Sequence, residues 1–202
     1  MAFGNYTELK ATIAEYVGRD DIDPQIAGFI ALVETELNHD ADFRLAQMQW
    51  EETLILDQDG EASLPPDFLE LYQASMGGGA NRRVLKLVDR SNPYVYWNFG
   101  ITGICIVDTG TITVPGAANG SVNLLYYSAI PPLSDTNPTN WVLAEAPALY
   151  LYGAIKSYTA FNREPQEHIA TIQMYEQAKD SIKAADRGRW HSMRVRIPSP
   201  TP

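Results

Sequence analysis

Residues 126–158 read YYSAIPPLSDTNPTNWVLAEAPALYLYGAIKSY, and within them the sequence changes from strand-like to helix-like. The stretch 122–127, which leads into them, is rich in branched and aromatic residues, and this composition favours a β-strand. Pro131, Pro132 and Pro138 then exclude both a helix and a central strand, so we expect an extended connector. Beyond Trp141, apolar residues recur at helical spacing. This predicts two helices, over 141–158 and 164–185.

The first 50 residues are also predicted to be helical. From Tyr6 the apolar residues follow one helical face, and Asn5 with Glu8 matches the capping-box pattern. Asp23 followed by Pro24 indicates the start of a second helix, with Asp23 as its N-cap. Glu34 is expected to point away from the apolar face of that helix, which holds Ile26, Phe29, Ile30, Val33 and Leu37.

The middle third of the chain has the pattern of a sheet. Short apolar runs separated by Gly, Pro, Asn and Asp predict antiparallel strands at 53–56, 84–88, 104–107, 111–114 and 122–127. Gln58 to Gly60 and Asp108 to Gly110 are expected to form hairpin turns, because glycine accepts a positive φ. The run from Leu64 to Asp67 is expected to cap a helical turn that begins near Phe68.

These patterns predict an α+β fold that is mainly α: a helical bundle with an inserted antiparallel β-rich region and an extended C-terminal arm. We expect residues 1–50 to form the N-terminal helices of the bundle and 51–128 the β-rich insertion. Residues 129–186 would add a C-terminal helix pair that completes the bundle, and 187–202 an extended basic arm. The expected partner-binding residues of this arm are Arg187, Arg189, Trp190, Arg194, Arg196 and Pro198.

Composition and charge narrow the function. Of 202 residues, 45% are hydrophobic and 20% charged, which is typical of a soluble globular protein, and no apolar stretch reaches bilayer length. Neither a signal sequence nor a disulfide is expected, since the start lacks a basic and apolar leader and Cys105 is the single cysteine. We therefore expect assembly in the cytoplasm, without a membrane, and Cys105 in the core.

The charges are unevenly distributed along the chain. Residues 1–186 hold eleven basic and twenty-five acidic side chains, a net charge of −14, whereas 187–202 hold four arginines and no acid. An acidic surface repels the phosphate backbone, so the body is not expected to hold nucleic acid by charge. Any double-stranded DNA nearby would pass rather than bind.

No pattern predicts a catalytic, cofactor or metal site. His39 with Asp40 and Asp42 matches no closed metal-site spacing. Residues 57–61 lack the remaining ligands of a calcium loop, and residues 77–81 lack the Lys-Ser or Lys-Thr pair of a phosphate-binding loop. Asp108-Thr-Gly110 is similar to the aspartic-protease loop, but a turn between strands explains it better. The aromatic residues Tyr94, Tyr96, Trp97 and Phe99 leave a carbohydrate-binding surface as an alternative to packing.

The quoted stretch resembles the tailed-bacteriophage head-to-tail adaptor (connector) proteins of the podovirus type. Weaker similarities lie at Leu37, Asn38, Arg44 and Met48 and at residues 64–68. The residues that carry the resemblance most strongly are Tyr126, Tyr127, Pro131, Asn140, Trp141, Pro147, Tyr150, Tyr152 and Gly153.

The resemblance implies a non-enzymatic structural virion protein at the head-tail junction. It implies a homo-oligomeric, dodecameric ring between the portal protein and a tail or nozzle protein, with a C-terminal arm on the portal and a channel for DNA passage and ejection. A carbohydrate- or host-binding tail module is the second hypothesis, and an Asp-Thr-Gly aspartic protease is the third.

Overall fold

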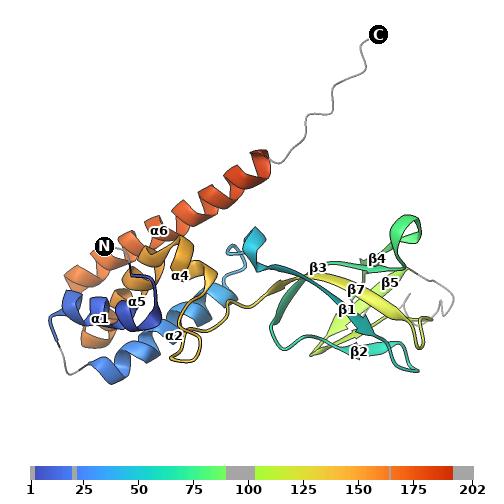
Figure 1. Cartoon of the computed structure of the whole chain (residues 1–202), viewed down its shortest axis with the longest axis horizontal. Helices are drawn as coiled ribbons and strands as arrows, with labels where there is room; N and C mark the ends of the chain where they lie inside the picture. The colour runs from blue at the N-terminus through green and yellow to red at the C-terminus, as the bar shows by residue number, and fades with distance from the viewer. Residues whose placement is uncertain (1–2, 20–21, 90–102, 164, 193–202) are drawn as a thin grey trace, which may run out of the picture. The chain divides into compact units, whose positions relative to one another are not determined.

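The computed structural model of the chain describes residues 3–19, 22–89, 103–163 and 165–192. The chain divides into two compact units. We call residues 1–47 with 130–202 the helical unit and residues 48–129 the sheet unit. Both are shown in Figure 1, and each is described by itself.

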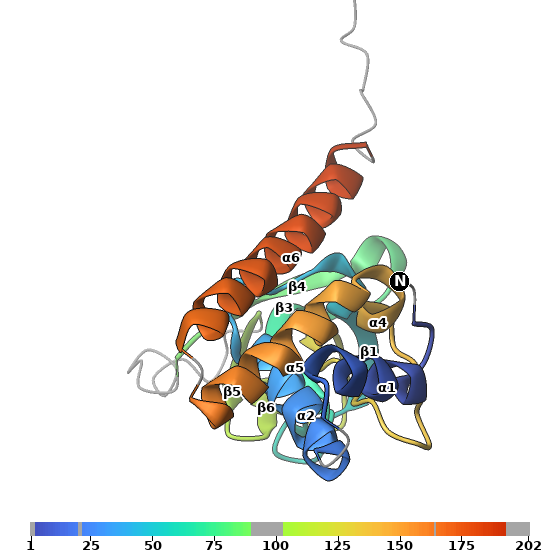
Figure 2. The same cartoon turned by 90° about the vertical axis from the view of Figure 1, so that its left-hand side faces the viewer.

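Five α-helices lie in the described part of the helical unit. They are α1 (Tyr6–Val17), α2 (Asp23–His39), α4 (Trp141–Glu145), α5 (Pro147–Asn162) and α6 (Pro165–Ser192). α5 packs against α1, α2, α4 and α6, so it is the central helix of the unit (Figure 2). Across the described residues, no helix combines the length and the apolar character that a bilayer crossing requires.

The helix ends follow local sequence signals. The Asn5 side chain accepts a 2.9 Å hydrogen bond from the Glu8 amide and donates to the Glu8 carboxylate, so the predicted capping box is confirmed. α2 begins at Asp23, with Ile22 rather than Asp23 at the N-cap position. The single helix predicted over 141–158 is divided, because α4 ends at Glu145 and Pro147 starts α5.

Gly153 allows α5 to approach α2 and α6 closely. A Cβ atom built at this position would lie 2.6 Å from Cγ2 of Val33 and 3.0 Å from Cε2 of Tyr175. Both neighbours are buried core side chains, so neither can move aside freely. The absence of a side chain at Gly153 therefore sets the spacing of three helices.

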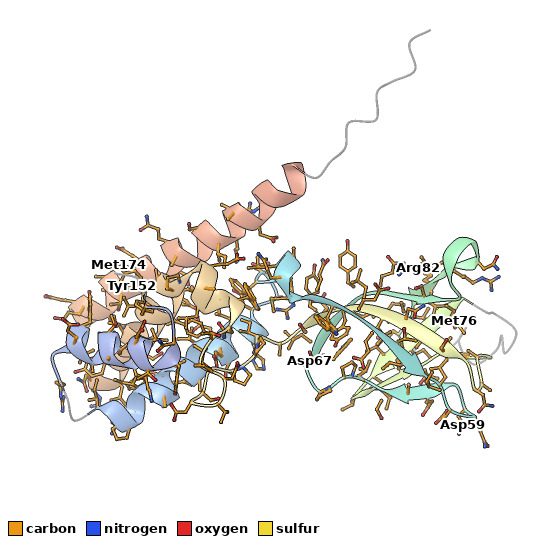
Figure 3. The ribbon with its side chains drawn as sticks, in the orientation of Figure 1. Asp59, Asp67, Met76, Arg82, Tyr152 and Met174 are labelled. Carbon is orange, nitrogen blue, oxygen red and sulfur yellow. The ribbon has the colours of Figure 1, made fainter. Side chains whose placement is uncertain are left out.

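The sheet unit contains seven described strands, in the order β1-β7-β3-β4-β5-β6-β2. Asp57 and Gly60 lie in the turn that joins the two outermost strands, so the sheet is nearly closed and barrel-like. Asp59 is also in this turn (Figure 3). The strand bounds are β1 (Gln49–Ile55), β2 (Glu61–Ser63), β3 (Phe68–Met76), β4 (Arg83–Leu87), β5 (Ile104–Asp108), β6 (Thr111–Thr113) and β7 (Ser121–Ser128).

The curled sheet encloses its own apolar core. Cys105 is fully buried there, as expected, and its burial raises the pKa of the thiol to about 11. The predicted hairpin turn at 108–110 is confirmed between the paired strands β5 and β6, with positive φ at Gly110. Residues 58–60 also form a turn with positive φ at Gly60, but it is not a hairpin, because β1 pairs with β7 and β2 with β6. The core residues are Leu56, Ala74, Leu85, Cys105, Ile112, Val114, Val122, Leu124 and Tyr126.

The predicted fold class, a helical bundle with an inserted antiparallel β-rich region and an extended C-terminal arm, is wrong. The sheet unit is a nearly closed seven-stranded structure with its own core, and not a small insertion in a bundle. The arm was also placed too early, because α6 continues through residues 187–192 to Ser192. Residues 193–202 lie outside the described residues.

Two strands were missed for identifiable reasons. β2 has only three residues, too few to show a period. β3 begins where a helical turn was predicted near Phe68, and its pairing with β7 is irregular between Phe68 and Glu70 and between Leu71 and Gln73. Such β-bulges break the strict alternation of strand side chains, so the apolar spacing of this strand is helix-like. The helical prediction for residues 1–50 was also wrong at its end. Trp50 lies in β1, and only residues 46–48 before it form a 3₁₀ turn.

One strand pair contradicts the antiparallel prediction. β4 and β5 are parallel, with Lys86 opposite Ile104 and Leu87 opposite Cys105. Sixteen residues, 88–103, separate the two strands, which is enough for the crossover of about a dozen residues that a parallel pair needs. The sequence between them gave no sign of this crossover.

Gly153→Ala is expected to lower the free energy of unfolding by about 1–3 kcal/mol, the usual cost of forcing an extra methyl group into a packed core. Gly28→Ala is the matched control, because a Cβ at this exposed α2 position meets nothing within 4 Å. It should raise stability by up to about 1 kcal/mol. Urea unfolding followed by circular dichroism measures both, and equal effects would contradict the packing argument.

Candidate functional site

A buried carboxylate holds the proline-rich connector to the helices. Glu34 of α2 is only 6% exposed, and its Oε1 accepts hydrogen bonds from the Leu133 amide at 2.8 Å and the Tyr150 hydroxyl at 2.9 Å. Burial raises the pKa of the Glu34 carboxyl, and the two hydrogen bonds offset part of that rise. The pKa of the Tyr150 hydroxyl is also raised, first by burial and second by the nearby Glu34 charge. This network joins α2, α5 and the connector.

Asn140 extends the network from the other side. Its Nδ2 donates to the Pro131 carbonyl at 2.8 Å and to the Tyr150 hydroxyl at 2.7 Å. Its Oδ1 accepts from the Leu143 amide at 2.9 Å, so it also caps α4. Both side-chain amide hydrogens and the oxygen are therefore used, which a buried amide requires. Asn140, Tyr150 and Pro131, predicted as family positions, are thus brought together.

The exit of α2 is held in a comparable way. The Asn38 side chain accepts from the Ile130 amide at 3.0 Å, where the chain re-enters the helical unit. The Arg44 guanidinium donates to the carbonyls of Asn38 and Asp40 at 3.2 and 2.9 Å. Asn38 and Arg44 therefore fix the backbone at both chain connections to this unit. This gives a structural reason for two of the weaker similarities in the sequence.

The two tyrosines at the start of the motif belong to the sheet unit. Tyr126 is buried in its core, stacks on Phe68 at 5.5 Å between ring centroids, and donates its hydroxyl to Asp67 at 3.1 Å. Tyr127 accepts a hydrogen bond from Gln49 and packs edge to face against Tyr72. The motif is therefore not one site, since part of it stabilises each unit.

A charged cluster fastens α6 to the other helices. Lys156 of α5 pairs with Glu36 of α2, and Lys179 of α6 lies 3.3 Å from an Asp40 oxygen and 3.0 Å from a Glu176 oxygen. Both ammonium groups lie over the buried Tyr175 ring, at 4.0 and 5.6 Å from its centroid. This cluster fixes the direction of α6.

The last turns of α6 carry the first residues of the predicted arm. Asp186 is buried and its carboxylate accepts from the Ala46 amide at 3.1 Å, so the helix is still held at this residue. Arg187 is exposed immediately after it. Arg189 and Trp190 are in the helix, whereas Arg194, Arg196 and Pro198 lie outside the described residues.

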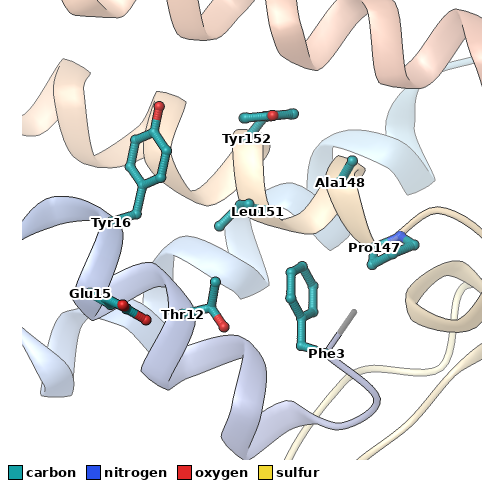
Figure 4. A pocket seen from close by; sticks show the side chains of 8 residues that line it. All are labelled: Phe3, Thr12, Glu15, Tyr16, Pro147, Ala148, Leu151 and Tyr152. Carbon is teal, nitrogen blue, oxygen red and sulfur yellow. The ribbon is translucent and has the colours of Figure 1, made fainter. Parts of the chain in front are cut away.

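An apolar groove of about 490 Å³ lies between α1 and α5 (Figure 4). Tyr152 and Pro147, two of the predicted family positions, line it, whereas Trp141 lies in the first turn of α4. Tyr16 remains 55% exposed, so the groove opens on the surface. Its lining comprises Phe3, Thr12, Glu15, Tyr16, Pro147, Ala148, Leu151 and Tyr152.

The chemical alternatives gain no support from the geometry. Asp108 accepts a hydrogen bond from the Thr109 amide inside the turn between β5 and β6. His39 Nδ1 contacts the Thr35 carbonyl at 2.7 Å. Among the described residues, no group of three His, Cys, Asp or Glu side chains is arranged to hold a metal ion. The aromatic residues Tyr94, Tyr96, Trp97 and Phe99 of the carbohydrate hypothesis lie outside the described residues.

A family model described as SU10 adaptor protein matches residues 4–198. The chain belongs to this family. No curated protein matches the sequence. The family consists of structural phage adaptor proteins, so the predictions of a phage adaptor and of a virion component are confirmed at that level. The match also covers the sheet unit, which is therefore part of the family fold.

Glu34 is the residue that the sequence interpretation placed wrongly. It was expected to point away from the core, yet it is the centre of the buried network. A signal was present, because Glu34 lies four residues after Ile30 and three before Leu37, both fully buried on α2. A carboxylate inside an apolar stripe indicates a buried partner.

The stability of the protein is expected to depend on the protonation of Glu34. A raised pKa in the folded state gives a contribution that is full below pH 4.5, the ordinary value, and is lost as the pH rises through the raised pKa. Relative to Glu34→Gln, the wild type should therefore lose stability as the pH rises. Urea unfolding of both proteins over a pH series measures this, and a constant difference between them would contradict it.

Proposed function

We propose that this chain is the subunit of a ring that joins the portal to the tail in a podovirus-type phage. In this proposal the C-terminal segment binds the portal protein, the opposite side meets a tail or nozzle protein, and the ring continues the DNA channel. Family membership supports the adaptor role. The observation that carries the finer proposal is the long helix α6, which leads to a basic segment.

The length of α6 supports a role for its C-terminal end in partner binding. It has 28 residues against 16 for α5, so at ~1.5 Å per residue the two helices span about 42 and 24 Å. α6 runs along α5 and continues past the N-terminal end of that helix (Figure 2). Arg187 and Arg189 lie in this continuation, and Arg194 and Arg196 follow it. Arginine is a frequent anchor of protein interfaces.

The acidic body suits a conduit for DNA. Residues 1–186 carry a net charge of −14. A surface of this sign repels phosphates, so a duplex could move past it without being held. The same charge would oppose binding of the body to nucleic acid in solution.

Arg194→Glu with Arg196→Glu is expected to weaken binding to the portal protein of the same phage at least about tenfold, because two interface charges are reversed. Lys86→Glu with Arg163→Glu is the matched control, since it changes the net charge equally at exposed positions elsewhere. Calorimetric titration of purified portal measures both. Unchanged binding by the arm variant would exclude the arm as the portal contact.

Particles assembled without this protein are expected to package DNA but to lose it and to carry no tail, because the proposed joint would be missing. Electron microscopy and DNA content of mutant particles measure this. Intact, tailed particles that retain their genome would exclude the proposed function.

A further inference from the structure

The groove between α1 and α5 is left open by the described part of the chain. Phe3 and Leu151 line it, and the Tyr16 ring is more than half exposed beside them. Glu15 is exposed at its rim. A fitting occupant would offer small or medium apolar side chains and a positive charge.

The C-terminal segment has this chemistry. Residues 193–197 read Met-Arg-Val-Arg-Ile, so apolar and basic residues alternate. In an extended chain successive side chains point to opposite sides, which would place the three apolar residues on one side and both arginines on the other. The apolar side matches the groove, and the charge is opposite to that of Glu15 and of the body.

The course of the chain favours a groove on another molecule. α6 leads past the N-terminal end of α5, whose first turns carry the groove residues 147–152, before it ends at Ser192. The five residues 193–197 follow directly, so the end of this segment lies at most about 17–18 Å from Ser192. Residues 193–197 contain no Gly, Asn, Asp, Ser or Pro, the residues that favour reversal of the chain.

We infer that residues 193–197 of one copy bind in the α1–α5 groove of a second copy. The inference rests on the proposed function, for it supplies a contact between subunits of the ring. The contact is heterologous, since segment and groove are different surfaces, and such contacts close into rings where the rotation permits. Of the two arginines on the opposite side of the segment, the one nearer the rim pairs with Glu15 and the other remains accessible to the portal.

Self-association of purified variants tests the inference. The intact chain should form oligomers as its concentration rises, whereas a chain ending at Ser192 and the variant Leu151→Lys should stay monomeric. Glu15→Arg, at an exposed position, should weaken association about fivefold, as expected for a charge at an interface rim. Ile169→Lys is the control for Leu151→Lys, because it also replaces an apolar residue with a lysine, at a 61% exposed position outside the groove. Light scattering gives the masses, and circular dichroism checks the fold.

Mixing two defective chains gives a sharper result. Leu151→Lys keeps the segment and lacks a working groove, and the chain ending at Ser192 keeps the groove and lacks the segment. Together they should form a dimer of one copy each, although each alone is monomeric. Should Leu151→Lys fail to fold, the truncated chain and Glu15→Arg decide the question.

The results separate a failure of this groove contact from a failure of the proposed function. Oligomers that persist equally in all variants would overturn this contact but leave the ring of the proposed function intact. An intact chain that stays monomeric at every concentration and still binds the portal would overturn the contact and leave the portal role. A monomeric chain without portal binding would overturn both.

Discussion

The helical unit depends on one buried carboxylate. Glu34 costs free energy because it is removed from water, and this cost is offset only while the Leu133 amide and the Tyr150 hydroxyl donate to it. Those donors come from the connector and from α5, so the charge can be accommodated only when both are in place. Asn140 makes the arrangement more specific by binding Tyr150 and Pro131 at once. The position of α5 follows from this requirement.

Gly153 and Tyr175 carry the constraint outward from α5. The close approach at Gly153 brings α2 and α6 to the same level of the central helix. The Tyr175 ring then lies under the ammonium groups of Lys156 and Lys179, whose ion pairs reach α2. α6 is thus held along its first half by packing and charge, and at Asp186 by a hydrogen bond. A well-anchored helix can present a free end in a fixed direction.

The sequence predicted local structure better than long-range pairing. The capping box of Asn5 with Glu8 and the turns at Gly60 and Gly110 depend on neighbouring residues, whose chemistry can be interpreted directly. β3 was missed because bulges disturb its alternation, and the parallel pairing of β4 with β5 depends on a crossover without a local signal. Glu34 was predicted to face away from the core because a charged side chain was assumed to be exposed, yet it is buried. Asn140 and Tyr150 were named as family positions, whereas Glu34, which accepts a hydrogen bond from Tyr150, was not.

The way the sheet closes has a consequence for behaviour at high concentration. Its outermost strands, β1 and β2, are linked by the turn at Asp57, and β2 offers only three residues of backbone. A long open edge would be a template for strand addition and hence for uncontrolled aggregation when many copies gather at one place. β2 therefore offers little free edge, and on the longer edge of β1 the exposed carboxylates of Glu51 and Glu52 oppose the addition of a further strand.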